Sequence, residues 1–467
     1  MHALYSSSRR VTMNSIMCNV KISTQGLNQA IGLSQSLMER WGCTNGQSIK
    51  VELGNRTIIT QARRIPHRGE KILISRETAK YLALPYSNEF RARYENRSLK
   101  LGPVIGIFTT SFSGNADQPF GKRSPLFKEF IKAGLEEHPI IYAFTPDLVD
   151  WQNRLIYGWH IVGNKWKQIK APFPDVIYER IPNRTIEARG YVQACLNRFK
   201  NEYNCPIFNQ GFFNKWKIHQ WLSSHPHTAN LVPETYLSPS ISTIKQMLDR
   251  HQMVYLKPSG GSLGLGIFRI TYDPEFGYYC RFREGDRNVL HRFRSLHKLV
   301  HHYFAKEPTR FQKYIVQQGI RLIKHKDQRP VDFRVHLHKD RFGEWTVVAI
   351  GSKAAGPGSV TTHVRTGGKI IPTDQILRDV FHEYAPTVEA GVKQASITIA
   401  ETLEQHVNGP LGELGMDMGV DKSGRVWLFE VNSKPGRHIF HHPSLVHAGH
   451  RSAKMVTEYS LNLTNFI

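Results

Sequence analysis

The sequence predicts a mixed α/β (α+β) protein of several domains, and three patterns along the chain support this prediction. Residues 46–65 alternate apolar and polar side chains, as strands do when one face is buried. Residues 101–210 alternate short apolar runs with segments of helical spacing, which is typical of a doubly wound sheet. Strand-like and helical segments mix again beyond residue 215. With 467 residues, the chain is long enough for two to four domains.

The first unit is predicted to be a β-rich domain spanning residues 1–98. In GQSIKVELGNRTIITQARRI, the apolar alternation turns around Gly54 and Asn55, a hairpin pattern. In EKILISRETAKYLALP, an apolar run leads to Ser75, a helix N-cap, and the helix stops before Pro85. The polar, arginine-rich stretch NEFRARYENRSLK that follows is interpreted as a linker.

The second unit, residues 101–210, is predicted to be an α/β domain with a parallel sheet. Its strand-like runs are GPVIGIFTT, PIIYAF, DVIYERI and CPIFN, and its helical segments are KRSPLFKEFIKAGLEE and RGYVQACLNRFKNEY. Helices near 215–223 and 241–251 follow, and then the strand MVYLKP.

Charge is the unusual quantity in the composition. Lys and Arg number 62 against 38 Asp and Glu, a net charge of +24, and residues 1–100 alone hold 16 basic and 6 acidic side chains. Such an excess attracts polyanions, whether nucleic acid, anionic polymer or acidic substrates, although a solvated basic surface without a partner is an equal alternative. No apolar run is long enough for a membrane-spanning helix, and no secretory signal is visible. The five cysteines form no CxxC pair, so we expect a reducing, cytoplasmic location.

A C-terminal hairpin, ELGMDMGVDKSGRVWLFEVNSKPGR, carries the first candidate site. Asp417 lies on its first strand, and Glu430 and Asn432 lie on the second. Residues two apart on a strand share a face, so Glu430 and Asn432 point the same way, and Asp417 can face them across the turn DKSG. Three oxygen ligands suit a hard cation such as Mg²⁺. The alternative is a solvated polar face of an amphipathic hairpin.

A glycine-rich loop follows Lys257 in MVYLKPSGGSLGLGIFRI. Glycines let backbone N–H groups approach phosphate oxygens, and the lysine adds a positive charge there. The loop is neither a P-loop, since GxxxxGK[ST] is absent, nor the protein-kinase arrangement, since HRD and DFG are absent. Many hairpin turns have a similar composition, so the loop alone is a weak signal.

Two more segments contribute polar groups. YIVQQGIRL places Gln317 and Gln318 where a strand passes between lobes, with backbone groups free for an adenine edge. In PVDFRVHLHKD, Arg334 is flanked by apolar residues, and a partly buried arginine needs an anionic partner. The alternative is a salt bridge with Asp332, Asp417 or Glu430.

The order of these motifs resembles the ATP-grasp superfamily. Within it, the phrases LGPVIGI, GFFNKWKIHQWL, LVPET, LKPSGGSLGLGI, YIVQQGI, PVDFRV and FEVNSKPGR resemble the YheC/YheD-type endospore-coat-associated proteins of spore-forming bacilli. The resemblance spans about residues 100–460. It implies an ATP-grasp fold with a pre-grasp domain at 101–210, a lid subdomain at 211–319 and a core subdomain with the Mg²⁺ site at 320–467.

The resemblance also implies roles for individual residues. Lys215 and Lys257 match the lysines that touch nucleotide phosphates, and Arg334 matches the basic residue near the transferred phosphoryl group; Arg334 and Lys257 are the expected catalytic residues. Asp417, Glu430 and Asn432 match the ligands of Mg²⁺, or of Mn²⁺ in its place. The flap over the phosphates comprises Ser259, Gly260, Gly261, Ser262, Gly264 and Gly266, and the adenine hinge comprises Gln318, Gly319 and Ile320.

The activity implied is an ATP-dependent carboxylate–amine ligase that acts through an acyl phosphate, with carboxylate and amine substrates that the sequence does not name. The alternative is a non-catalytic, nucleotide-binding coat protein, in which the basic N-terminal unit holds an acidic spore-coat or other polyanionic partner. Binding of nucleic acid is a third reading that rests on charge alone. One departure concerns His363 in THVRTGG, where many ligase relatives have Asn, so the loop from Lys353 to Gly368 is expected to close differently on substrate or not to close at all.

Two other patterns in the sequence suggest different chemistry, and both are disfavoured. The tail HIFHHPSLVHAGH could hold a transition metal, but it lacks Cys and HExxH, and Pro443 breaks the helix that such spacing needs. No cysteine has a neighbouring His and acid in sequence, so a cysteine nucleophile is disfavoured.

Overall fold

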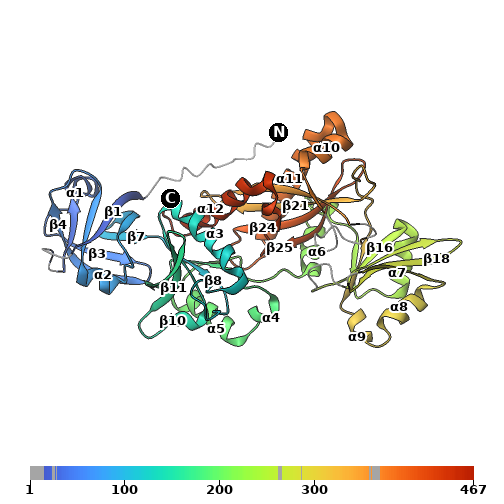
Figure 1. Cartoon of the computed structure of the whole chain (residues 1–467), viewed down its shortest axis with the longest axis horizontal. Coiled ribbons are helices and arrows are strands. Elements are labelled where there is room, and N and C mark those ends of the chain that lie inside the picture. Colours follow the sequence, from blue (N-terminus) through green and yellow to red (C-terminus); the bar gives the residue numbers. More distant parts are fainter. Residues whose placement is uncertain are drawn as a thin grey trace.

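The computed structural model describes residues 15–23, 27, 29–260, 266–285, 287–356, 359 and 369–467. Figure 1 shows a small β-barrel at one end, an α/β sheet beside it, a second sheet with its helices, and a third sheet at the other end. The mixed α/β class with a β-rich N-terminal domain, predicted from the sequence, is confirmed. In the described part of the chain, no helix combines the length and the apolar character needed to cross a membrane.

Seven strands close into the N-terminal barrel in the order β1-β5-β2-β4-β3-β7-β6. The predicted hairpin around Gly54 and Asn55 is confirmed, as is the helix capped by Ser75, whose side chain accepts a hydrogen bond from the Thr78 N–H. The elements are β1 (Ile16–Ser23), β2 (Ile31–Ser34), α1 (Gln35–Trp41), β3 (Ser48–Leu53), β4 (Arg56–Ile65), β5 (Lys71–Ser75), α2 (Arg76–Leu82), β6 (Asn88–Glu95) and β7 (Ser98–Gly102).

The linker predicted at residues 88–100 is wrong. This stretch forms the antiparallel pair β6 and β7, which completes the barrel. Its apolar side chains Phe90, Ala92, Leu99 and Leu101 are fully buried, and its charged side chains lie between them. The stretch is polar by composition, but it alternates with a period of two, and the alternation decides its structure.

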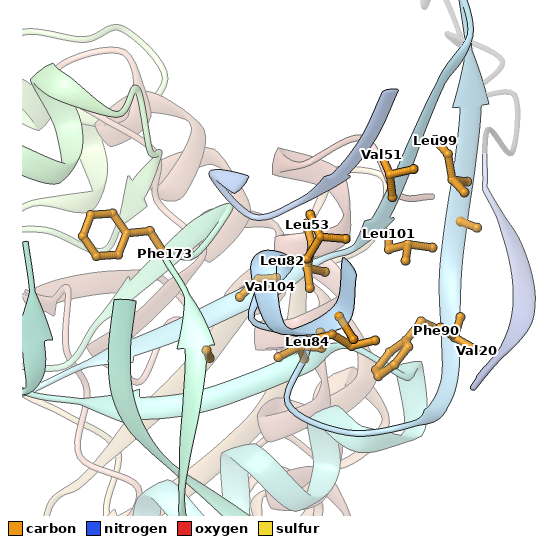
Figure 2. Close-up of a cluster of buried hydrophobic side chains, with 14 of the residues drawn as sticks. Val20, Val51, Leu53, Leu82, Leu84, Phe90, Leu99, Leu101, Val104 and Phe173 are labelled. Carbon is orange, nitrogen blue, oxygen red and sulfur yellow. The ribbon is translucent and has the colours of Figure 1, made fainter. Parts of the chain in front are cut away.

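The barrel packs directly on the next domain. One hydrophobic cluster contains barrel residues such as Leu53 and Leu101 together with Val104 and Phe173 of the α/β domain (Figure 2). A Cβ atom at Gly54 would lie 2.2 Å from the carbonyl oxygen of Phe173. The backbone segments around these two residues therefore approach each other so closely that only glycine fits at position 54. The barrel is therefore continuous with the rest of the core.

The α/β domain has the predicted parallel strands β9, β8, β13 and β14, paired in that order. An antiparallel hairpin, β11 with β12, extends the sheet and was not predicted. The elements are β8 (Val104–Phe108), α3 (Ser124–Gly134), β9 (Ile140–Phe144), β10 (Val149–Asp150), β11 (Leu155–Val162), β12 (Lys165–Pro172), β13 (Val176–Glu179), α4 (Arg184–Glu187), α5 (Gly190–Glu202) and β14 (Ile207–Phe208).

The second sheet, which we call the core sheet, has the order β23-β22-β21-β24-β25. One of its faces packs on α11 and also on α6, since Ile218 and Leu222 belong to the same hydrophobic cluster. The C-terminal helix α12 packs on α3 of the preceding domain. The elements are α6 (Lys215–Ser223), β21 (Val331–Lys339), β22 (Trp345–Ala354), β23 (Lys369–Ile371), α10 (Thr373–Phe381), α11 (Ala385–Glu404), β24 (Glu413–Val420), β25 (Val426–Asn432) and α12 (Val446–Leu463).

The third sheet, which we call the lid, has the order β15-β20-β16-β17-β18-β19. Apolar side chains of β16, β17 and β18 pack against α7 and α8 on one face only. The opposite face is therefore left for polar residues. The elements are β15 (Thr235–Leu237), α7 (Ile241–His251), β16 (Met253–Pro258), β17 (Phe268–Asp273), β18 (Gly277–Glu284), β19 (Arg287–Phe293), α8 (Leu296–Phe304), α9 (Pro308–Phe311) and β20 (Tyr314–Gln318).

Candidate functional site

The acidic hairpin forms as predicted, and a β-bulge aims its carboxylates. Asp417 on β24 pairs with Glu430 on β25, whereas Met418 pairs with Leu428, so Phe429 is an extra residue. Leu428 is buried in the core cluster, and strict alternation would point Glu430 into the same core. The extra residue reverses the alternation, so Glu430 shares the face of Asp417, while Val431 returns to the core.

Three basic side chains surround these carboxylates. Arg334 stands beside Asp417 in the register of β21 and β24, and its Nη2 lies 3.2 Å from Asp417 Oδ2. Lys353 of β22 places its Nζ 2.9 Å from Asp417 Oδ1 and 3.1 Å from Asp332 Oδ1. Lys215, the first residue of α6, lies 2.6 Å from Glu430 Oε1. The salt bridge that the sequence offered as the alternative for Arg334 is thus present, with Asp417 as its partner.

This arrangement fixes the charges of the buried groups. Burial alone would raise the pKa of Asp417, but the Arg334 guanidinium and the Lys353 ammonium outweigh it and hold the pKa well below its usual range. Burial likewise tends to lower the pKa of Lys353, but Asp332 and Asp417 overcome this and raise it. Asp417 and Lys353 are therefore both charged at neutral pH.

Lys257 joins the site from the lid. Its Nζ donates a hydrogen bond of 2.7 Å to Gln317 Oε1 and lies 5.9 Å from the centre of the Phe429 ring on the core hairpin. Burial, together with the positive charge of Lys215, lowers the pKa of Lys257 to about 8, against the opposing effect of Glu430. The charges of Lys215 and Glu430 therefore both act on Lys257. Among the described residues, no carboxylate forms a salt bridge with Lys257, whereas Lys215 is paired with Glu430.

Backbone hydrogen bonds connect the start of α6, which carries Lys215, to the segment that follows Lys257. The Lys215 N–H donates to the Ser259 carbonyl at 3.2 Å, and the Ser259 N–H donates to the Lys313 carbonyl at 2.9 Å. The start of the predicted flap is therefore anchored to the start of α6. Gly260 and Gly266 follow in the described chain, and Gly266 has a φ of +69°. Gly261, Ser262 and Gly264 lie outside the described residues, as does His363.

The predicted hinge has defined backbone partners. The Gln318 N–H donates to the Glu234 carbonyl at 2.8 Å, and the Gly319 N–H donates to the Met253 carbonyl at 2.9 Å. No described group accepts a hydrogen bond from the Ile320 N–H. The free hydrogen-bonding groups of the hinge are therefore that N–H and the backbone carbonyls beside it.

Gly319 is required by close packing, which gives a testable prediction. A Cβ atom there would lie 2.8 Å from the Met253 carbonyl oxygen and 2.6 Å from its Cγ. Gly319→Ala is expected to cost about 1–3 kcal/mol of unfolding free energy, because the hinge must move away from β16. Urea denaturation measures this, with Gly260→Ala as the matched control, since a Cβ at Gly260 meets nothing within 4 Å. Equal stability of the two variants would contradict the packing argument.

The structure therefore brings together Lys215, Lys257, Arg334, Asp417 and Glu430 from four separate segments. Asn432 ends β25, half-buried, two residues beyond Glu430. Sequence reasoning missed two contributors, Lys353 and the ring of Phe429, and it named Asp332 only as an alternative partner of Arg334. A signal existed for Lys353, since GSKAAG puts one lysine among small residues at the end of an apolar strand.

The donor set fits a hard cation such as Mg²⁺. Two carboxylates stand directly opposite each other, and an amide side chain follows on the same strand. The Nε and Nη1 atoms of Arg334 are buried without a hydrogen-bond acceptor in the described structure, so an anionic group near Asp417 would satisfy them. Oxygen ligands from Asp417, Glu430 and Asn432, with phosphate oxygens completing the shell, meet the requirements of such an ion.

A second cluster of potential metal ligands is structural. His336, His338 and Glu413 lie within 4.8 Å of one another and are fully buried. Arg180 already approaches the Glu413 carboxylate at 3.1 Å, and Arg437 at 3.8 Å. Burial lowers the pKa of His336 to about 3, so this ring is neutral. The group joins the α/β domain to the core sheet and needs no added cation.

The C-terminal histidines and the cysteines also form no catalytic or metal site within the described chain. The C-terminal histidines form no cluster of three potential metal ligands there, and His450 pairs with Glu136 at 2.8 Å. All five cysteines are buried thiols without disulfides. Burial raises the pKa of the thiols, to about 12 in Cys195, which makes them poor nucleophiles.

The fold and the site define an ATP-grasp protein, in which a lid sheet and a core sheet face each other across lysines and carboxylates. A profile of YheC/D-like ATP-grasp domains matches residues 204–463. The chain belongs to this YheC/D-like ATP-grasp family, as its sequence motifs predicted.

Curated relatives agree with this assignment. Endospore coat-associated protein YheD of Bacillus subtilis (strain 168) is 34% identical over 408 residues, which cover 85% of this chain and 87% of the relative. Endospore coat-associated protein YheC of the same organism is 23% identical over 283 residues, covering 60% and 75%. Among solved structures, D-alanyl-alanine synthetase A of Vibrio cholerae aligns with a TM-score of 0.44 at 16% identity, covering 78% of this chain and 99% of that one.

Proposed function

We propose that this protein is an ATP- and Mg²⁺-dependent ligase that joins a carboxylate to an amine. One observation carries the proposal: Lys257 is a half-buried lysine of the lid without a carboxylate partner among the described residues, and it lies beside Phe429 on a core hairpin of two opposed carboxylates. A triphosphate placed between them would give each charge a partner. The proposal includes the domain boundaries and the site roles that the sequence predicts.

The chain's own groups suit each part of ATP. An adenine edge presents a donor and an acceptor side by side, and the Gln318 carbonyl with the Ile320 N–H can meet them, since groups two residues apart on an extended chain point the same way. Lys215 and Lys257 would bind phosphate oxygens. Mg²⁺, or Mn²⁺, held by Asp417, Glu430 and Asn432, would offset the remaining charge on the β- and γ-phosphates.

Transfer then needs positioning more than covalent chemistry. A carboxylate oxygen of the substrate attacks the γ-phosphorus and ADP leaves, which gives an acyl phosphate. An amine nitrogen attacks the acyl carbon, phosphate leaves, and the nitrogen loses a proton to water. Arg334 and Lys353 flank Asp417 and would stabilise the charge on the transferred group. Each such contact is worth on the order of 10²–10³ in rate.

The proposal predicts that ADP release depends on an added carboxylate. Purified protein with MgATP, screened against amino acids and peptidoglycan precursors, is expected to release ADP well above its background with the correct carboxylate, and to form an amide when an amine is added. Coupled detection of ADP, with mass spectrometry of the products, measures both steps. ATP binding without any carboxylate-stimulated turnover across the screen would contradict a ligase.

The second candidate is a non-catalytic, nucleotide-binding coat protein. The names of the relatives favour it, since both are called endospore coat-associated. The basic barrel supports it too, because residues 1–100 carry a large positive excess that suits an acidic coat partner. On this reading the protein is made in the cytoplasm and joins the spore coat, and ATP binding without turnover is its expected signature.

A further inference from the structure

The lid face that carries Lys257 continues into a row of arginines. Tyr255 pairs with Arg269, and Arg269 pairs with Arg281, so the three side chains project from one face of β16, β17 and β18. The neighbouring row of Leu256, Phe268 and Phe282 projects from the other face and packs among α7 and α8. The arginine row therefore lies on the face opposite these helices, which are labelled beside the lid strands in Figure 1.

Two further arginines widen this surface. Arg283 lies two residues beyond Arg281 on β18, and Arg292 pairs with Tyr279 in the next row of the same face. We call Arg269, Arg281, Arg283 and Arg292 the lid arginine face. Among the described residues that are paired on this face, one is acidic, Asp273. Its carboxylate accepts hydrogen bonds from the backbone N–H groups of Glu275 and Phe276 in the turn that follows.

The placement of these arginines carries an energetic cost. Arg269 and Arg281 stand directly opposite each other, and like charges at such positions destabilise a sheet. Opposite charges face each other on the other side of the sheet, where Arg287 of β19 pairs with Glu284 of β18, and such a pair stabilises a sheet. An anion bound beside the opposed arginines would offset this repulsion, and a row of like charges on one face attracts polyanions.

We propose that the lid arginine face binds an extended, carboxylate-rich peptide, which is the acid substrate of the ligase proposed above. Guanidinium forks match carboxylates in geometry and charge. Arg281 and Arg283 are separated by about 6.4–6.8 Å along their strand, which is also the repeat of alternate side chains in an extended peptide. Tyr255, in the arginine row, lies two residues before Lys257 on β16, so a peptide on this face leads toward Lys257. The identity of the substrate rests on the proposed function, whereas binding to this face does not.

The experiment measures fluorescence anisotropy of a fluorescein-labelled oligoglutamate peptide with the full chain, and of oligoglutamine of the same length. Oligoglutamate is expected to bind with an affinity that falls as salt increases, and oligoglutamine is not expected to bind. Arg281→Gln combined with Arg292→Gln is expected to raise the Kd for oligoglutamate about tenfold. The single variant Arg292→Gln is compared with Arg287→Gln, which also removes one charge but from the other face of β19, and the Kd of Arg287→Gln is expected to stay unchanged.

Parallel titration with MgATP separates this proposal from the ligase assignment. The double variant is expected to bind MgATP like the wild type, which also shows that it is folded. Equal weakening by Arg287→Gln would overturn the assigned face, because net charge alone would then explain binding. Tighter binding of labelled single-stranded DNA of equal charge, lost in the double variant, would overturn the peptide as the occupant. Failure to bind MgATP would refute the ligase and leave the peptide result to be judged by itself.

Discussion

Replacing Glu430 by glutamine is expected to lower ATP turnover by about 10²–10³-fold and to remove the Mg²⁺ dependence of nucleotide binding. The amide keeps the shape of the side chain on β25 but loses one of the two opposed carboxylates. Lys215 Nζ also loses its ion-pair partner at 2.6 Å, so the positive charge near the phosphates is no longer balanced. Isothermal titration with ATP, with and without Mg²⁺, and steady-state ADP release measure the two effects.

The matched control is Glu401→Gln, which makes the same chemical change at an exposed position on α11. It is expected to leave turnover and Mg²⁺ dependence unchanged. A folded Glu430→Gln variant with wild-type affinity for MgATP would show that the acidic hairpin does not form the nucleotide site.

Replacing Lys257 by glutamine is expected to weaken ATP binding about 10–100-fold, because one charge-assisted hydrogen bond to phosphate is lost. Glutamine can still donate to Gln317 Oε1, so the local structure has a means of surviving the change. The Kd for MgATP measures the effect. Lys298→Gln, an exposed lysine on α8, is the control and is expected to bind ATP like the wild type.

The pKa of Lys257 adds a dependence on pH to the same experiment. Because burial and Lys215 lower this pKa to about 8, Lys257 is charged at pH 7 and mostly neutral at pH 9 in the free protein. Binding of phosphate requires the charged form, so the Kd for MgATP is expected to rise above pH 8, by up to about tenfold per pH unit. Lys257→Arg keeps its charge throughout this range and is expected to abolish the rise. A rise that persists in Lys257→Arg would assign the titration to another group.

Local sequence signals predicted most elements near the site. The bounds of α6 and α7 were predicted closely, because Asn214 and Ser240 cap them and apolar residues follow at helical spacing. The acidic hairpin was predicted from its turn, since DKSG separates two apolar strands. These signals act within a few residues, so a single sequence contains them in full.

Long-range pairing supplied what the sequence could not. The residues 88–100 have the composition of a linker, and only their neighbours in the barrel turn them into β6 and β7. Lys353 joined the site because β22 pairs with β21, which brings its ammonium to Asp332 and Asp417. Each of these contacts depends on strand order, which the sequence does not encode locally.

The sequence by itself determined the family of this protein and pointed to the residues of the proposed site: the lysines before the predicted flap and on α6, and the two carboxylates on one hairpin. Spacing along a strand was enough to place Glu430 and Asn432 on one face. Only the tertiary structure decided that this face lies outside the core, because the extra residue Phe429 reverses the alternation after Leu428. It also decided that the lid arginines form one surface, since side chains from β17, β18 and β19 share a face only through their register.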